Sequence, residues 1–195
     1  MPRFPPIPPS EQTPEQKLGH EEMDLLTQQT FGSNSSFRLK NSEGALLGPF
    51  ATLLYTPTLI SPWLNITHRV FTLPVLSVRE KELAIFAVLS HSRAAYALYA
   101  HTRLAEDAGL SPTQVTDARE GKLPQGLSER EEAAYVLVGE LIRMRGPLDD
   151  GAFERAKNVL GMEGVAALMH LTGSYLYSSV LLNAADVCLP EGEKI

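Results

Sequence analysis

The sequence contains a single cysteine, Cys188, among 195 residues. One cysteine excludes an internal disulfide, a Cys-x-x-Cys redox pair and a zinc site built from several thiolates of the same chain. The first residues, MPRFPPIPPSEQTPEQK, contain no apolar segment like that of a secretory signal. We therefore expect a protein of a reducing, cytoplasmic compartment.

Positive charge is also sparse. The chain has 17 Lys and Arg against 23 Asp and Glu, a formal net charge of -6, and its basic residues are scattered. Recognition of phosphate backbones needs clustered Lys and Arg, so we do not expect nucleic acid as a partner.

The longest apolar stretch, residues 164–189, contains more polar side chains than a membrane-spanning helix usually does. We interpret that stretch as a buried helix and expect no membrane partner.

No segment shows the alternation of apolar and polar residues that is typical of a half-buried strand. Helix-start signals recur instead, as a Ser or Thr followed three residues later by Glu or Gln. They are Thr13 with Gln16, Ser77 with Glu80, Ser111 with Gln114, and Ser128 with Glu131. The sequence therefore predicts an all-α fold of about seven or eight helices.

The length suits one domain with an extended arm. Residues 1–15 hold six prolines, which fix the backbone and remove donors, so this segment is expected to be an arm that lies along its own subunit or a neighbour. Residues 16–190 are expected to form a single helical domain, followed by a tail over 191–195.

The pattern Leu-Ser-x-Arg-Glu occurs twice, beginning at Leu76 and, 51 positions later, at Leu127. It suggests an internal structural repeat. Two unrelated helices that share only a capping box would produce the same letters, so both interpretations stay open.

The stretch Ser77–Gly109 contains the main candidates for chemistry. Glu82 lies in a helix that is apolar nearly all round, and a carboxyl group held there is a candidate acid or base. The alternative is a solvent-facing glutamate, or a partner of Arg79 three residues earlier. His101 lies on a second helix, and its alternative role is that of a buried neutral histidine satisfied by a neighbour. On one straight helix these two side chains would lie about 30 Å apart, so they can meet only if the chain reverses, which we expect at Ser90–Ser92.

Tyrosines and a further histidine accompany this pair. Tyr96 and His91 are candidate donors to an oxyanion, and Tyr99 is a candidate substrate contact, although aromatic residues at helical spacing are equally typical of a core. Tyr175 follows Gly173, where a ligand could approach the backbone or another helix could pack.

Metal and phosphate motifs are missing. His68, His91, His101 and His170 have neither an i, i+4 histidine nor a carboxylate at ligand spacing, and there is no glycine-rich phosphate loop or nucleophile elbow. We therefore expect no metal and no other cofactor.

The run LSVREKELAIFAVLSHSRAAYALYAHTRLAEDAGLS resembles the carboxymuconolactone decarboxylase family, which shares its all-α fold with the alkylhydroperoxidase D-like proteins. The likeness continues at Gly48-Pro49-Phe50, in the segment with Pro57 and Pro62, and from Gly173-Ser174-Tyr175 to Leu182-Asn183, and so covers about residues 45–190. It implies an alkylhydroperoxidase D-like bundle and a homo-oligomer, commonly a trimer or hexamer, in which the arm could wrap a neighbour.

In the peroxidase branch of these proteins, Cys-x-x-Cys-x-x-x-His follows a helix with a glutamate. The resemblance matches that glutamate with Glu82, the histidine with His101, and the cysteines with Ala94 and Ala97. A thiol mechanism needs thiolates, so we expect no peroxidase activity of that kind. Many decarboxylase-like relatives have a glutamate where this chain has Ala97, and that group is missing too. The remaining site would be smaller and more apolar, with Ala94 and Ala97 among its substrate-binding positions.

These observations lead to the hypothesis of a cofactor-free acid/base enzyme for a small carbonyl- or lactone-bearing metabolite. Decarboxylation, isomerisation and cyclisation all need a base or acid next to a carbonyl and a donor for the enolate oxygen. His101 would be the base or acid, with Glu82 as its partner. The first alternative is a non-catalytic protein that binds a metabolite or partner, and a weaker one is a redox protein that uses Cys188.

Overall fold

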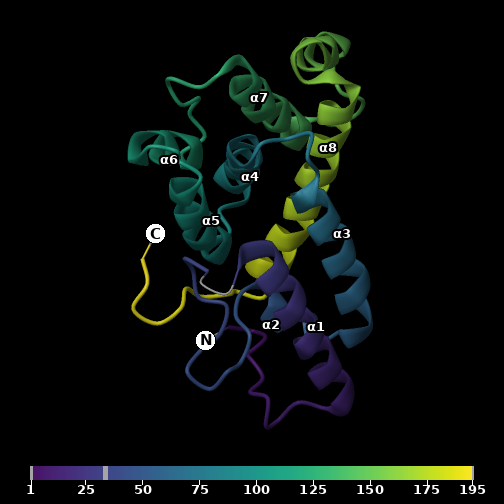
Figure 1. The fold of residues 1–195 in the computed structure, drawn as a ribbon, viewed down its shortest axis with the longest axis vertical. Helices are drawn as coiled ribbons and strands as arrows, with labels where there is room; N and C mark the ends of the chain where they lie inside the picture. Colours follow the sequence, from purple (N-terminus) through teal and green to yellow (C-terminus); the bar gives the residue numbers. More distant parts are fainter. Residues whose placement is uncertain (1, 33–34, 195) are drawn as a thin grey trace. The chain divides into compact units, whose positions relative to one another are not determined.

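The structure, a computed structural model, describes residues 2–32 and 35–194. Over these residues it contains α-helices, one short 3-10 helix and no β-strand, apart from an isolated bridge between Lys40 and Leu46 (Figure 1). The predicted all-α class is confirmed. The elements are α1 (Pro14–Phe31), α2 (Pro49–Leu53), η1 (Pro57–Leu59), α3 (Ile60–Thr72), α4 (Val78–Ser92), α5 (Ala95–Asp107), α6 (Pro112–Arg119), α7 (Glu129–Arg143) and α8 (Asp150–Ala184).

All four predicted helix starts are capping boxes in the structure, on α1, α4, α6 and α7. In each, the Ser or Thr oxygen accepts the backbone N–H three residues on, and the Glu or Gln side chain accepts the N–H of the cap residue. The start of α8 is capped by Asp149, whose Oδ2 accepts the N–H of Ala152 at 2.9 Å. Local sequence chemistry therefore determines where these helices begin.

The chain divides into two compact units. The first comprises residues 1–72, 94–100 and 178–195, and the second comprises residues 73–93 and 101–177. The chain passes from one unit to the other within the continuous helices α5 and α8. The expectation of one domain over 16–190 stays a prediction.

The first unit has a core formed by α1, the α2–α3 region and the segment before it. The side chains that make it are Met23, Leu46, Phe50, Leu53, Leu54, Ile60, Trp63 and Leu64. The proline-rich arm lies along this unit, because Arg3 donates its backbone N–H to the carbonyl of Ala185 at 2.9 Å and Tyr55 donates its hydroxyl to Pro5 at 2.8 Å. In this chain the arm thus follows its own subunit.

The second unit is organised around α4, which packs against α6 and α7. Every residue of α4 from Glu80 to Leu89 is buried, as its apolar composition predicts. In the same unit, Gly161 adopts a left-handed backbone conformation, with φ 74°, and interrupts α8 near the predicted break.

By length and composition α8 could cross a membrane, but the core helices of soluble proteins satisfy the same test. In the most apolar window of α8, 44% of the residues are buried inside the protein.

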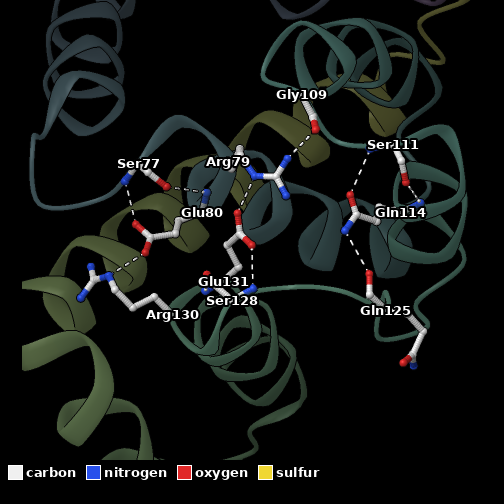
Figure 2. A network of polar contacts seen from close by, with 10 residues as sticks. All are labelled: Ser77, Arg79, Glu80, Gly109, Ser111, Gln114, Gln125, Ser128, Arg130 and Glu131. Atoms are coloured by element: carbon white, nitrogen blue, oxygen red, sulfur yellow. Dashed lines mark hydrogen bonds and ion pairs between the residues drawn. The ribbon is translucent and has the colours of Figure 1, made fainter.

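The two Leu-Ser-x-Arg-Glu segments are joined by reciprocal ion pairs (Figure 2). Arg79 of the first segment binds Glu131 of the second at 2.5 Å, and Arg130 of the second binds Glu80 of the first at 2.7 Å. The other carboxylate oxygen of each glutamate accepts the N–H of its own cap serine. Each glutamate therefore caps its own helix and forms an ion pair with the arginine at the start of the opposite helix.

The arginines extend the same pattern beyond the helix starts. Arg79 also donates to the carbonyl of Gly109, at the end of α5, and Arg130 donates to the carbonyl of Val159 at 3.2 Å, near the Gly161 break. The two segments thus have equivalent contacts in equivalent places, which a capping box alone would not produce. These contacts favour the interpretation of the repeated pattern as an internal structural repeat.

Replacing Arg130 with alanine should destabilise the fold. The change leaves the buried carboxylate of Glu80 without its charged partner and frees two carbonyls, and hydrogen bonds to charged groups are worth roughly 1.5–3 kcal/mol each. Because the arginine is 42% exposed, we expect a loss of about 1–3 kcal/mol in the free energy of unfolding, measured with chemical denaturant. The matched control is Arg155→Ala, an exposed arginine of α8 with no ion pair among the described residues, which should change stability little. Equal effects of the two changes would contradict the assigned role.

Acid should weaken the same network. Burial alone would raise the pKa of Glu131, but hydrogen bonds from Arg79 and Ser128 outweigh it and lower that pKa below its ordinary value. A carboxyl group whose pKa is lower in the folded state stabilises the fold above its unfolded pKa, about 4.3, and this contribution disappears as the pH falls through the folded pKa. Unfolding measured between neutral and acid pH should therefore show a smaller acid loss in Glu131→Gln than in the parent. Parallel pH profiles for the two proteins would refute this assignment.

Candidate active site

The chain reversal between Glu82 and His101 lies at Arg93 and Ala94, so the prediction of Ser90–Ser92 was wrong by a few residues. α4 continues through Ser92, and the Ser90 hydroxyl donates to the Ala87 carbonyl of the same helix at 2.9 Å. Arg93 ends α4 in the left-handed conformation, with φ 56°, and its N–H reaches the carbonyl of Leu89 at 2.8 Å. α5 then begins at Ala95.

The reversal brings Glu82 and His101 into direct contact within the second unit. Nδ1 of His101 lies 2.8 Å from Oε2 of Glu82, and the two residues are 6% and 0% exposed. A neutral histidine that donates its Nδ1 proton to this carboxylate carries its lone pair on Nε2. Among the described residues no hydrogen bond to Nε2 is present. The arrangement is that of a base oriented by a carboxylate.

The second oxygen of Glu82, Oε1, is buried and has no hydrogen-bond partner among the described residues. An unsatisfied buried oxygen of a charged group is costly for folding. The pair thus contains one strong polar contact and one open acceptor, both enclosed in apolar surroundings.

Tyr175 is the third member of this group. Its ring meets the His101 ring edge to face, with centroids 5.1 Å apart and an interplanar angle of 76°. Burial, and after it the negative charge of Glu82, raises the pKa of Tyr175 well above its ordinary value, so the phenol keeps its proton. The sequence suggested Tyr175 because of the glycine before it, and contained no signal of its contact with a histidine 74 positions earlier.

Tyr96 and Tyr99 have a different environment, in the first unit. The Tyr96 hydroxyl donates to the carbonyl of Arg38, and the Tyr99 hydroxyl accepts the N–H of the same residue at 3.1 Å. A side chain at Gly48 would collide with the Tyr96 ring, so this glycine, with φ 65°, permits the close approach. Burial raises the pKa of Tyr96, and Tyr99 adds to the effect. Both phenols therefore hold the loop before α2, and Tyr96 could serve a substrate only by releasing Arg38.

The other predicted site residues differ in their exposure to solvent. His91 is exposed in the last turn of α4, unlike the buried pair. Ala94 and Ala97 are 0% and 7% exposed. Their roles, like the oxyanion role of Tyr96 and the substrate contact of Tyr99, stay predictions.

The second copy of the repeat lacks the carboxylate of Glu82. The offset of 51 residues that aligns the two Leu-Ser-x-Arg-Glu patterns places Ala133 at the position of Glu82. Ala133 lines a groove of about 530 Å³ between α7 and the first part of α8. The buried carboxylate of Glu82 thus has no counterpart in α7.

The metal-ligand and cysteine candidates of the sequence are located as follows in the described part of the chain. Residues 2–32 and 35–194 contain no group of three or more His, Cys, Asp or Glu side chains able to hold a metal ion. Cys188 is exposed, in the first unit, and lies beside a groove of about 490 Å³ formed by the arm, the loop before α2 and the C-terminal segment.

Residues 57–139 match the carboxymuconolactone decarboxylase family. This stretch contains α4, α5 and both members of the polar pair. The predicted family resemblance is confirmed. No curated protein matches the chain.

Two solved structures are similar to this chain in fold. One is a cysteine-to-alanine variant of the debrominase Bmp8 in complex with 2,3,4-tribromopyrrole, with a TM-score of 0.72 and 15% identity over 96% of this chain and 91% of that one. The other is the apo debrominase Bmp8, with a TM-score of 0.70 and 13% identity over 96% of this chain and 92% of that one. At these identities the likeness shows the fold alone, which agrees with the predicted helical bundle.

The Glu82–His101 pair should behave as one energetic unit. Removing the imidazole leaves the buried Glu82 carboxylate without a hydrogen-bond donor on either oxygen, which costs more than the roughly 1–3 kcal/mol of an unsatisfied neutral group. We expect His101→Leu alone to lower the free energy of unfolding more than the double change Glu82→Leu with His101→Leu. Chemical denaturation of the four proteins of this cycle gives the coupling energy. Additive effects would show that the two side chains do not interact in solution.

Proposed function

We propose that this protein is an acid/base enzyme for a small carbonyl- or lactone-bearing metabolite, with His101 as the catalytic base or acid. The observation that carries the proposal is the direct 2.8 Å contact between His101 and Glu82 in a buried setting. Such a contact holds the imidazole in one tautomer and stabilises its protonated form. Membership of residues 57–139 in the decarboxylase family supports action on a small molecule.

His101 would remove a proton from a carbon next to a carbonyl through Nε2. The electron pair of the C–H bond moves into the enolate, the proton moves to the imidazole, and Glu82 balances the resulting charge. In an isomerisation or cyclisation the proton returns to another atom of the same molecule. In a decarboxylation, carbon dioxide leaves first and the protonated imidazole then supplies the proton to the enolate carbon. None of these reactions needs an external oxidant or reductant.

The enolate oxygen needs a donor. Tyr175 is well suited, because it contacts the His101 ring and keeps its proton at neutral pH. Tyr96 and His91 remain possible donors, Tyr96 only after its hydrogen bond to the Arg38 carbonyl opens.

Debrominase Bmp8 was crystallised with a small halogenated pyrrole, which supports a compact ring-shaped ligand for the present fold. Ala94 and Ala97 carry no thiol, so dehalogenation through a thiol at these positions is not proposed.

The alternative, a binding protein without turnover, is favoured by the two alanines at positions where relatives carry reactive groups. The contact between Glu82 and His101 argues for catalysis, because a site that only binds would not need an oriented base. Screening separates the two functions, since a ligand that binds without proton exchange identifies the binder.

The substitution that tests the proposal is His101→Gln. With a panel of small keto acids and lactones in deuterated water, NMR detects exchange of the protons next to the carbonyl as well as turnover. General acid/base catalysis contributes about 10²–10⁴-fold, so His101→Gln should lower the rate by that factor. Glu82→Gln should reduce the rate less, because the imidazole keeps a hydrogen-bonding neighbour.

The matched control is His170→Gln, which changes an exposed histidine of α8 and should leave the rate unaltered. Circular dichroism and thermal unfolding establish that each variant is folded. A folded His101→Gln protein with the parental rate would overturn the assignment.

A further inference from the structure

The groove beside Cys188, in the first unit, has no part in the proposed acid/base chemistry. We call it the arm groove, because the proline-rich arm forms one wall and the loop before α2 and the C-terminal segment form the others. Its volume of about 490 Å³ lies within the range of roughly 300–1,000 Å³ that is typical of small-molecule sites. The apolar part of its lining includes Phe4, Leu47, Val187, Leu189 and three prolines.

Arg38 is the residue on which the polar side of the arm groove depends. Both polar atoms of its backbone are hydrogen-bonded, because its carbonyl accepts the Tyr96 hydroxyl and its N–H donates to the Tyr99 hydroxyl at 3.1 Å. These two tyrosines are almost fully buried, at 2% and 1% exposed. The side chain of Arg38 is 57% exposed and lines the groove. A fixed backbone therefore presents a guanidinium that a solute can reach.

The donors of this guanidinium are only partly used. Its Nε lies 3.3 Å from a carboxylate oxygen of Glu193, and its Nη1 donates to the carbonyl of Glu191 at 3.0 Å. A guanidinium has five N–H groups, and among residues 2–32 and 35–194 the Arg38 side chain makes no other hydrogen bond, so three remain. A carboxylate bound side by side with an arginine needs two. The contact with Glu193 also shows that a carboxylate can approach this side chain.

The neighbouring charges favour a ligand with a single negative charge. Lys40 also lines the groove, but its ammonium is paired with Asp24 at 2.6 Å. Among the described residues, Glu191 is the one acidic member of the lining, and its carboxylate would repel a ligand with several negative charges. The positive charge that a ligand meets is thus mainly that of Arg38.

We propose that the arm groove binds a small organic molecule that has one carboxylate and an apolar body. Arg38 would hold the carboxylate, and the apolar body would lie against Phe4, Leu47 and Leu189. A neutral apolar molecule would gain nothing from the guanidinium, and inorganic phosphate would leave the apolar walls uncovered.

This binding site goes beyond the proposed function and does not depend on it, because the groove and the Glu82–His101 pair belong to different units. It also assigns a purpose to Tyr96 and Tyr99. Their buried hydroxyls would fix the arginine that receives the ligand, instead of acting on a substrate themselves.

The single cysteine of the chain lines the groove and is exposed, so its alkylation reports whether the groove is occupied. The probe is 4-fluorobenzoate, whose binding to the full chain is measured directly by fluorine NMR, and neutral 4-fluorobenzamide is the control ligand. We expect the benzoate to bind and to slow the alkylation of Cys188 by iodoacetamide, followed by mass spectrometry. The benzamide should do neither.

Arg38→Gln tests the anchor. It removes the charged donors and keeps the backbone contacts with Tyr96 and Tyr99, so the loop should retain its conformation. We expect the Kd of 4-fluorobenzoate to rise by roughly 10–100-fold, which is the contribution of hydrogen bonds to a charged group, and the protection of Cys188 to disappear. Protection is taken as the ratio of alkylation rates with and without benzoate in each protein. The matched control is Arg69→Gln, an exposed arginine of α3 in the same unit with no ion pair among the described residues, which should alter neither value.

Circular dichroism establishes that both variants are folded. The proposal is overturned if 4-fluorobenzoate does not bind up to its solubility limit, or if 4-fluorobenzamide binds equally well. It is also overturned if inorganic phosphate at the same concentration displaces the benzoate, since charge alone would then be sufficient. Binding that leaves Cys188 unprotected would place the ligand elsewhere, and a folded Arg38→Gln protein with the parental affinity would remove the anchor; either result refutes the proposal.

Discussion

The reciprocal ion pairs between the two Leu-Ser-x-Arg-Glu segments are the constraint on which the second unit depends. Glu80 and Glu131 are each nearly buried, and each accepts from its own helix start and from the arginine of the opposite segment. A carboxylate with that many donors is stabilised in its charged form, and it permits only one register of α4 against α7. Every side chain further along α4 is positioned by that register.

Glu82 lies two residues after Glu80, and so it owes its position to the same network. Its helix is buried on all sides from Glu80 to Leu89, which leaves its carboxylate no route to water. The turn at Arg93 and Ala94 then returns the chain so that His101 supplies the one polar partner. The pair is therefore preorganised by the fold before any ligand arrives, as a catalytic base requires.

Much of this could be predicted from the sequence, because the signals are local. The capping boxes at Thr13, Ser77, Ser111 and Ser128 consist of residues three positions apart, and their chemistry is independent of distant packing. The family resemblance identified both Glu82 and His101 as site residues. The reversal was predicted too early because serines are common at helix ends, whereas the Ser90 hydroxyl donates to a carbonyl of its own helix and α4 ends only at Arg93.

Other features could not be read from the sequence because they depend on residues far apart in the chain. Tyr96 and Tyr99 are residues of a type that often serves in catalysis. Only the structure shows that their hydroxyls form hydrogen bonds with the backbone of Arg38, about 60 positions earlier. The contact between Tyr175 and His101 is of the same kind. A repeated five-residue pattern, similarly, cannot reveal whether its charges pair within a segment or across to the other copy.

The internal repeat provides an argument about why the polar pair exists. The second copy has the same capping box and the same ion pairs, yet it has Ala133 where the first has Glu82. A helix of this kind can therefore form without a carboxylate at this position. Glu82 keeps one oxygen unsatisfied at 0% exposure, which lowers stability. A residue that the fold does not need, and that reduces its stability, favours the proposed acid/base role with His101.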